Sequence, residues 1–342
     1  MVIQGITGSI LAFEPELDRV SHPHLAYVKP GTRVLSLNEI RTAVSRQFGG
    51  EPIVAFEPSL SPRLSSQLLL PSGIAYVNQY TGEVLGVRVR GQSFLGYVRA
   101  LHVRLGVGAL GRNILRWSAV AALLSSVSGF YLWWPMKRIS VLFTAGPKRF
   151  WFDLHNVIGI CSLLPLTLLA GSGVVLGFED QAAWLIHRVT HSTAKPSSFS
   201  ERKPIAGASM IDADEAVAIA QSLMPGTLPY RVQMPEYGGL YRIGLVNPRD
   251  RITGSRNSVA LDPSNGAVVS VNRTADLSIS DWILAANETV HTGSVMGLPT
   301  RVLASFFSMI VFVQALSGAF LWLHRKKILQ PAAHSVLQVR SK

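Results

Sequence analysis

The sequence has little of what builds small secreted proteins or soluble cofactor enzymes. It contains one cysteine, Cys161, inside a hydrophobic run, so a disulfide framework and a CxxC site are both excluded. Charged residues make up only 15% of the 342 residues, whereas hydrophobic residues make up 48%. No Walker loop, HExxH, GxSxG or catalytic-triad motif is present. With a mean hydropathy of +0.29, this composition predicts a membrane protein.

The chain also lacks the setting that a nucleotide site needs. Gly106, Gly108 and Gly111 spell GxGxxG, a fingerprint that should follow a strand, open a soluble helix and precede an acidic residue by about 20 positions. Here Arg104 precedes the motif, a hydrophobic run follows it, and residue 131 is tyrosine. We therefore reject dinucleotide binding.

Hydrophobic runs predict membrane spans. From Val157 to Phe178 there are 22 residues without a formal charge, and about 20 suffice to cross a hydrocarbon core. We predict spans at 151–179, 113–134 and 302–323. The opening MVIQGITGSILAF is apolar but too short to cross, and it lacks the basic start of a signal peptide. We interpret residues 1–14 as the remnant of a first span.

The two halves of the chain repeat each other. Gly8-Ser-Ile-Leu-Ala-Phe-Glu14 recurs as Gly173-Val-Val-Leu-Gly-Phe-Glu179, at an offset of 165 residues. Four further features recur at an offset of 189, namely Ser128-Gly129 with Ser317-Gly318, Leu132-Trp133 with Leu321-Trp322, His102 with His291, and Arg112 with Arg301. Such ordered offsets predict an internal duplication of one unit, a span, a small α+β domain and a second span.

The segments between the spans have soluble composition. A capping box at Ser36–Glu39 and a capped helix start at Asp212 mark corresponding helices, each followed by strand-like runs. The predicted fold is a membrane α-helical bundle of four spans, the first truncated, with two small α+β domains. Their predicted ranges are 15–98 and 204–280, with outer segments at 99–112, 180–203 and 281–301, a loop at 135–150 and a tail at 324–342.

The net charge of +12 does not indicate nucleic-acid binding, because the basic residues flank the spans. They are Lys137, Arg138, Lys148 and Arg149 in the loop, and Arg325, Lys326 and Lys327 after the last span. This positive-inside pattern predicts that the loop and the C-terminus are cytoplasmic and that both α+β domains are outside.

Three histidines stand at the ends of predicted spans. His102 and His291 precede spans two and four on the outer side, and His155 opens span three on the inner side. Imidazoles from facing helices suit the axial positions of a haem iron, and Arg112 and Arg301 would neutralise propionates. The alternative is that these are helix-cap and headgroup contacts preserved by the duplication. Chemistry alone leaves both readings open.

The remaining histidines are weaker candidates. His187 and His191 are spaced to share a helix face and to bind a metal, but a solvated interfacial role is favoured. The pair at His22 and His24 has strand or loop spacing and is also expected to be solvated. His155 has no partner in the repeat, because the matching position, −10, precedes Met1. We expect either a start placed too late or a shortened copy.

The motif set resembles the PepSY-associated transmembrane family, often called iron-regulated membrane proteins. The motifs are LHVRLG at 101–106, SGFYLWWP at 128–135, FWFDLHNVIGI at 150–160, VHTG at 290–293 and SGAFLWLHRKK at 317–327. The resemblance implies four spans, two periplasmic PepSY-like domains and a location in the bacterial inner membrane. It also implies a histidine on each span, of which this chain matches His102, His155 and His291. His324 is a weaker substitute on the inner side.

Some members of that family are implied to be haem-binding reductases of ferric siderophores. The leading hypothesis is therefore a protein with one or two b-type haems that moves electrons from a separate donor to a ferric chelate. His102 and His291 would share an outer haem, and His155 would serve an inner one. The runner-up is a non-enzymatic anchor whose PepSY-like domains bind a peptide, a peptidase or a siderophore-uptake partner. A transport role is a third, weaker reading.

Overall fold

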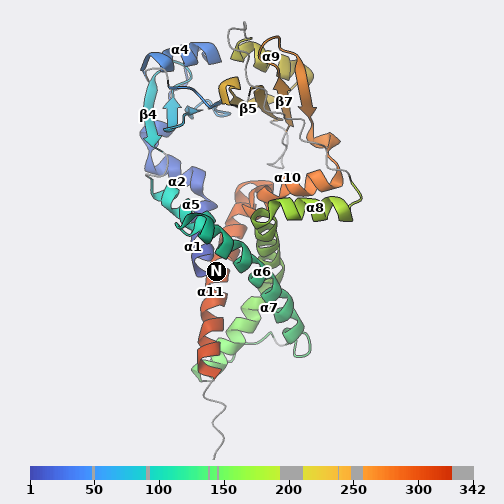
Figure 1. The fold of residues 1–342 in the computed structure, drawn as a ribbon. Helices are drawn as coiled ribbons and strands as arrows, with labels where there is room; N and C mark the ends of the chain where they lie inside the picture. The colour runs from blue at the N-terminus through green and yellow to red at the C-terminus, as the bar shows by residue number, and fades with distance from the viewer. Residues whose placement is uncertain are drawn as a thin grey trace, which may run out of the picture.

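The computed structural model describes residues 1–47, 51–89, 93–137, 139–144, 146–192, 211–237, 239–247 and 257–325. Long helices form a bundle at one end of the molecule, and a β-sheet covered by two helices forms a lobe at the other (Figure 1). Arg138, Lys326 and Lys327, which supported the predicted orientation, lie outside the described residues.

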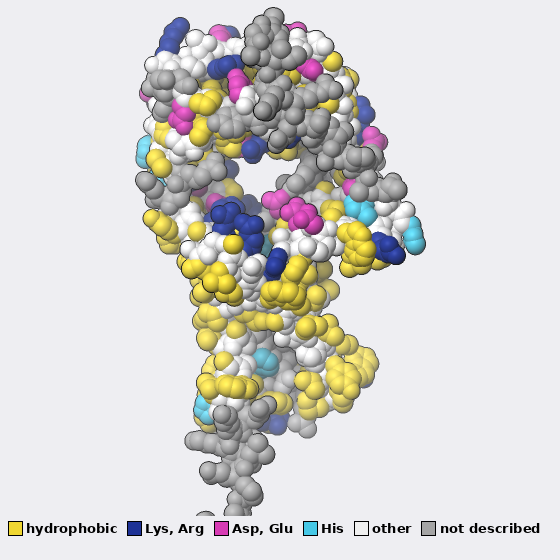
Figure 2. Space-filling view, in the orientation of Figure 1, with side chains coloured by type: hydrophobic (Ala, Val, Ile, Leu, Met, Phe, Trp, Pro, Cys, Tyr) yellow, Lys and Arg dark blue, Asp and Glu magenta, His cyan; other side chains and the backbone are white. Residues whose placement is uncertain are grey.

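Three of the described helices are long and apolar enough to cross a membrane. They are α6 (Gly108–Trp133), α7 (Pro147–Gly177) and α11 (Leu298–Arg325). Large apolar side chains point outward from each, such as Leu124, Leu164 and Leu303, and hydrophobic atoms cover the bundle (Figure 2). An apolar surface of this extent on a helical bundle is the surface that lipid covers. The second, third and fourth predicted spans are thus confirmed as helices of spanning length.

The first predicted span is a ten-residue helix, α1 (Val2–Leu11). At 1.5 Å per residue it is about 15 Å long, half of a hydrocarbon core. It packs on the half of α11 nearer the lobe, where a Cβ on Gly5 would lie 2.7 Å from the carbonyl oxygen of Ser308. The Ser9 hydroxyl donates to the Ser305 carbonyl at 2.8 Å, and the Ser305 hydroxyl donates back to the Ser9 carbonyl at 3.1 Å. Small residues therefore hold the two backbones close.

The predicted outer continuation of the third span is wrong. α7 ends at Gly177, and α8 (Glu179–Val189) leaves it at a steep angle beside α10 (Ile279–His291) (Figure 1). Phe178 between them has non-helical dihedral angles, and Glu179 and Asp180 begin the new helix, where acidic residues favour a helix start. His187 lies on α8, whereas His191 follows its end with a φ of 52°. The two histidines do not share a helix face.

Eight antiparallel strands form one sheet in the order β4-β3-β2-β1-β5-β6-β7-β8. The join between the halves is short, with Ala55 opposite Gln233 and Phe56 opposite Val232. The two predicted α+β domains therefore share a sheet, which strand composition alone did not indicate. The strands are β1 (Ala55–Glu57), β2 (Ser66–Leu69), β3 (Gly73–Val77), β4 (Val84–Val89), β5 (Leu228–Gln233), β6 (Tyr241–Val246), β7 (Asn257–Leu261) and β8 (Val268–Asn272).

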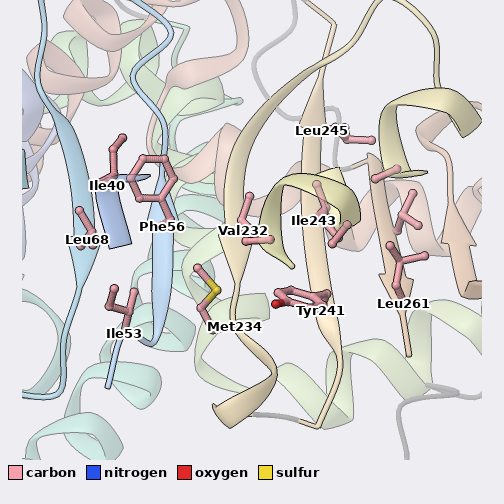
Figure 3. Packing of buried hydrophobic residues seen from close by; sticks show 14 of the residues in the cluster. Ile40, Ile53, Phe56, Leu68, Val232, Met234, Tyr241, Ile243, Leu245 and Leu261 are labelled. Carbon is pink, nitrogen blue, oxygen red and sulfur yellow. The ribbon is translucent and has the colours of Figure 1, made fainter. Parts of the chain in front are cut away.

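Helices α4 (Leu37–Gln47) and α9 (Ala213–Leu223) cover one face of this sheet (Figure 1). Both begin with the predicted caps. The Ser36 amide donates to the Glu39 carboxylate at 2.7 Å while the Glu39 amide donates to the Ser36 hydroxyl at 3.2 Å, and Asp212 accepts from the Glu215 amide at 2.7 Å. The apolar core beneath them is continuous across the join, and includes Ile40, Phe56 and Leu68 from one half with Val232, Ile243 and Leu261 from the other (Figure 3).

Short helices connect the lobe to the bundle. The order helix, four strands, helix and long helix occurs twice, first as α4 to α6 and again as α9 to α11. Helix α5 (Phe94–Arg104) leads from β4 into α6, as α10 leads from β8 into α11. The other described connectors are α2 (Glu14–Ser21), α3 (Pro23–Ala26), η1 (Pro235–Tyr237), η2 (Thr274–Asp276) and η3 (Ser294–Met296).

Candidate functional site

His102 and His291 meet where the two connecting helices reach the bundle. His102 lies near the end of α5 and His291 is the last residue of α10. Their ring centroids are 6.3 Å apart and their planes are inclined by 51°. The structure thus brings together two residues that are 189 positions apart in the sequence, as the repeat predicted.

Glycine corners direct each connecting helix toward this point. After α5 the backbone turns through left-handed conformations at Leu105, Gly106 and Gly108, and a Cβ on Gly111 would overlap the carbonyl oxygen of Arg104. After α10, Gly293 and Gly297 have φ values of 69° and 72°. These turns favour glycine because side chains are strained there. The GxGxxG stretch therefore forms a tight corner that positions His102.

A hydroxyl group lies against each of the two rings. The Nδ1 atom of His102 is 2.9 Å from Oγ1 of Thr7 on α1, and Nδ1 of His291 is 3.0 Å from Oγ of Ser172 on α7. A second residue of α10, Asn287, donates to the Ser172 carbonyl at 3.2 Å. Asn287 and His291 are one helical turn apart, so both hold the same point of α7.

The environment keeps both imidazoles neutral. Burial, followed by the charges of His291 and Arg99, lowers the pKa of His102 from 6.5 to about 4. Burial also lowers the pKa of His291. A neutral imidazole has a free lone pair on one nitrogen, which is the form that binds a metal ion. Two neutral rings that face each other are a donor set suited to a single iron.

His155 lies in a second, inner site. It is on α7, and its Nδ1 is 2.7 Å from the Ser317 hydroxyl of α11. The Gln314 side chain, on the helix of Ser317, donates to the His155 carbonyl at 3.0 Å, the reverse of the bond from Asn287 on the histidine helix to the Ser172 carbonyl. Seventeen residues of α7 separate His155 from Ser172, or about 25 Å at 1.5 Å per residue. The two sites are therefore near opposite ends of one helix.

The two arginines predicted to neutralise propionates have different surroundings. Arg301 forms a bidentate pair with Glu16 of α2, at 2.8 and 2.7 Å, and donates to the Ala12 carbonyl at 3.4 Å. The hydrogen bond to Arg301 lowers the pKa of Glu16. Arg301 therefore ties α2 to α11. Arg112 is exposed near the start of α6.

The other histidines have ordinary contacts. His187 lies 3.3 Å from the Ser192 hydroxyl and 3.7 Å from Asp281, and His22 lies 3.6 Å from Asp18. The ring of His324 packs on Phe320, with its Nδ1 2.8 Å from that residue's carbonyl oxygen. Among the described residues no group of three or more His, Cys, Asp or Glu side chains could hold a metal ion.

Thr7, Ser172 and Ser317 were not predicted as site residues. Ser317 and its copy Ser128 were noted as markers of the repeat, and serines in spans were expected to serve helix packing. The signal was nevertheless present, because Thr7-Gly8 and Ser172-Gly173 are separated by the offset of 165. A hydroxyl residue followed by glycine thus occurs once in each of α1, α6, α7 and α11.

A family model described as the PepSY-associated TM region matches residues 1–325. No curated protein matches the chain.

Proposed function

Since the chain belongs to the PepSY-associated transmembrane family, we propose that it is a multi-pass protein of the bacterial inner membrane that carries electrons to ferric iron. In this proposal its α+β lobe is periplasmic, its C-terminus is cytoplasmic, and its two halves arose by duplication. His102 and His291 would hold an outer b-type haem, which supplies one-electron transfer. The proposed acceptor is Fe(III) in a siderophore or a similar chelate.

The distance between the two imidazoles carries this proposal. A metal lies about 2 Å from an imidazole nitrogen, and that nitrogen lies about 1.1 Å from its ring centre, so two rings on one metal have centroids about 6.2 Å apart. The observed separation is 6.3 Å. Histidines that served only as headgroup contacts would have no reason to lie at this distance from each other, partly buried and neutral.

His155 is proposed as a ligand of an inner haem. Its ring is held by Ser317, and its position about 25 Å along α7 from Ser172 places it toward the opposite side of the membrane. His324 is the nearest candidate for a second ligand in the sequence of α11, seven residues beyond Ser317, about 10 Å along the helix. Electrons would enter at this inner side from a separate donor.

A ferric chelate would approach the outer site from the lobe side. An opening passes between the sheet and the helices below it, and its lower edge carries basic side chains on the left and acidic side chains to the right of them (Figure 2). Arg104 of α5 and Arg112 of α6 are exposed. Cationic side chains at an opening attract anionic ligands, and many ferric chelates carry negative charge.

The absorption spectrum of the purified protein tests the proposal. We expect a Soret band at near-stoichiometric haem and a change in the spectrum on reduction with dithionite. His102→Ala and His291→Ala should each lose the outer haem, whereas His24→Ala, a change at an exposed histidine, should keep it. Protein purified from haem-replete cells without a Soret band would overturn the proposal.

A second candidate function is a non-enzymatic anchor. The strands β4 and β8 are the edges of the sheet, and each has one neighbouring strand among the described residues. An exposed edge offers backbone groups to an extended peptide. This function predicts that His102→Ala and His291→Ala leave iron acquisition unchanged and that charges or prolines placed on β4 or β8 abolish it.

A further inference from the structure

The three histidines of the two sites are partly buried, and each has the same contact. The Nδ1 atoms of His102, His291 and His155 lie 2.9, 3.0 and 2.7 Å from the side-chain hydroxyl groups of Thr7, Ser172 and Ser317. In every case the hydroxyl belongs to a different helix from the histidine. The same arrangement therefore occurs at the outer site twice and at the inner site once.

The hydrogen-bond roles at these contacts follow from the helix backbone. Thr7 donates its hydroxyl hydrogen to the Ile3 carbonyl at 2.6 Å, and Ser172 donates its own to the Leu168 carbonyl at 2.7 Å. Ser317 donates to the Gln314 carbonyl at 3.2 Å. A hydroxyl has one hydrogen, and an oxygen that gives it to its own helix accepts from the imidazole. That arrangement puts the proton on Nδ1 and the lone pair on Nε2. The short carbonyl bonds of Thr7 and Ser172 favour it at the outer site, whereas at Ser317 the contact with the imidazole is the shorter of the two.

The glycine after each hydroxyl residue makes room for the ring. A Cβ on Gly8 would lie 3.3 Å from Cε1 of His102, and a Cβ on Gly173 would lie 3.5 Å from Cε1 of His291. Gly318 has the same relation to His155 at 3.5 Å. A Cβ at these positions would touch the edge of the ring, and at Gly8 it would also lie 2.6 Å from the Ser308 hydroxyl, so glycine leaves the space that the ring borders.

The fourth pair, Ser128-Gly129, provides an internal contrast. Ser128 donates to the Ser125 carbonyl at 3.1 Å, as its counterparts do to theirs. No described atom lies within 4 Å of a Cβ built on Gly129. The bond from the hydroxyl to its own helix therefore forms without a histidine, and the imidazole is an added partner at the other three pairs.

We propose that Thr7, Ser172 and Ser317 are positioning residues that fix the tautomer and orientation of the three histidines. Each hydroxyl holds a ring with Nε2 directed away from the hydroxyl's own helix, so that Nε2 is the ligand atom. The role of this orientation rests on the proposed function, in which Nε2 would bind the iron of a haem. Hydrogen bonds of this kind orient metal ligands and raise their basicity.

Two measurements test the inference separately from haem binding. In the haem-free protein, nitrogen NMR of labelled histidines should assign the proton of His102 and His291 to Nδ1. Thr7→Val and Ser172→Ala should each convert part of the adjacent histidine to the other tautomer. Thr7→Ser should retain the wild-type signal, because it keeps the hydroxyl.

In haem-loaded protein, Thr7→Val and Ser172→Ala should weaken haem retention by about 10- to 100-fold, the usual cost of removing such a bond. The matched control is Ser162→Ala, since the buried Ser162 of α7 donates to the Ile158 carbonyl at 2.6 Å, and its hydrogen bonds among the described residues go to carbonyls of its own helix. Equal haem retention in Thr7→Val, Ser172→Ala and Ser162→Ala would overturn the inference. A proton on Nε2 in the wild type would do the same, whereas wild-type protein that binds no haem would instead overturn the proposed function.

Discussion

Acidification should destabilise the haem-free protein through His102. In the folded chain the pKa of this imidazole is about 4, whereas that of a solvated histidine is 6.5. The pKa is lowered by burial and by the nearby His291 and Arg99. The unfolded state therefore binds the proton more readily than the folded state. The stabilising contribution is complete above pH 6.5 and is lost as the pH falls toward 4.

The magnitude follows from the difference between the two pKa values. At 1.36 kcal/mol for each pKa unit, the shift corresponds to about 3 kcal/mol of unfolding free energy between pH 7.5 and pH 4. This is a large share of the free energy of unfolding of a typical domain, which is roughly 5–15 kcal/mol. The protein should therefore unfold more easily in mild acid when no ligand occupies the imidazoles.

The assay is a denaturation series on haem-free protein in one detergent, at pH 7.5, 6.5, 5.5 and 4.5, with wild type and His102→Gln compared at each pH. Glutamine does not titrate in this range, so the difference in unfolding free energy between the two proteins isolates His102. We expect wild type to lose about 2.5 kcal/mol relative to the variant between pH 7.5 and pH 4.5. His24→Gln is the control for removal of an exposed histidine. A wild-type-minus-variant difference that stays constant with pH would refute the reasoning.

Three further predictions concern the supports of the site. Glu16→Gln should lower the melting temperature, because it leaves Arg301 without its bidentate partner; about 1–2 kcal/mol is expected at this partly exposed pair, and an unchanged melting temperature would contradict it. Asp212→Ala should cost about 1 kcal/mol by removing the cap of α9, measured as lobe unfolding by circular dichroism, whereas Asp212→Asn should restore most of it. Gly293→Ala should displace His291 and reduce haem content, because residue 293 has a left-handed conformation and the new Cβ would overlap that of Ala304. Normal haem content in this variant would show that the corner is not required.

The long-range pairing of His102 with His291 could be predicted from the sequence because the repeat encodes it. Equal offsets imply equal places in two copies of one unit, and two such places at the outer ends of adjacent helices lie close together. The capped helices at Ser36 and Asp212 were predictable for a local reason, since their partners are three residues away. In each case the information lies in spacing.

Two other features depend on contacts that spacing does not describe. The join of β1 with β5 involves residues about 178 positions apart whose strand composition is ordinary, so nothing in either segment identifies the other as its neighbour. The turn at Phe178 was also not predictable from composition, because a hydrophobic run followed by an amphipathic one has the composition of one continuous helix. The role of Thr7 required knowledge of which hydroxyl faces which ring.

The narrow join of the sheet affects how far the two imidazoles can separate. His102 is carried by the helix that follows β4 and His291 by the helix that follows β8, which are opposite edges of the same sheet. Below the sheet, the same two helices rest on α1 and α7, which both contact α11. The chain thus forms a closed frame around the opening, in which the two halves of the lobe are joined by the strand pairing of β1 with β5 and by the shared apolar core. If both were disrupted, the two halves of the lobe would move independently, and the gap between the rings would then be set by the bundle alone.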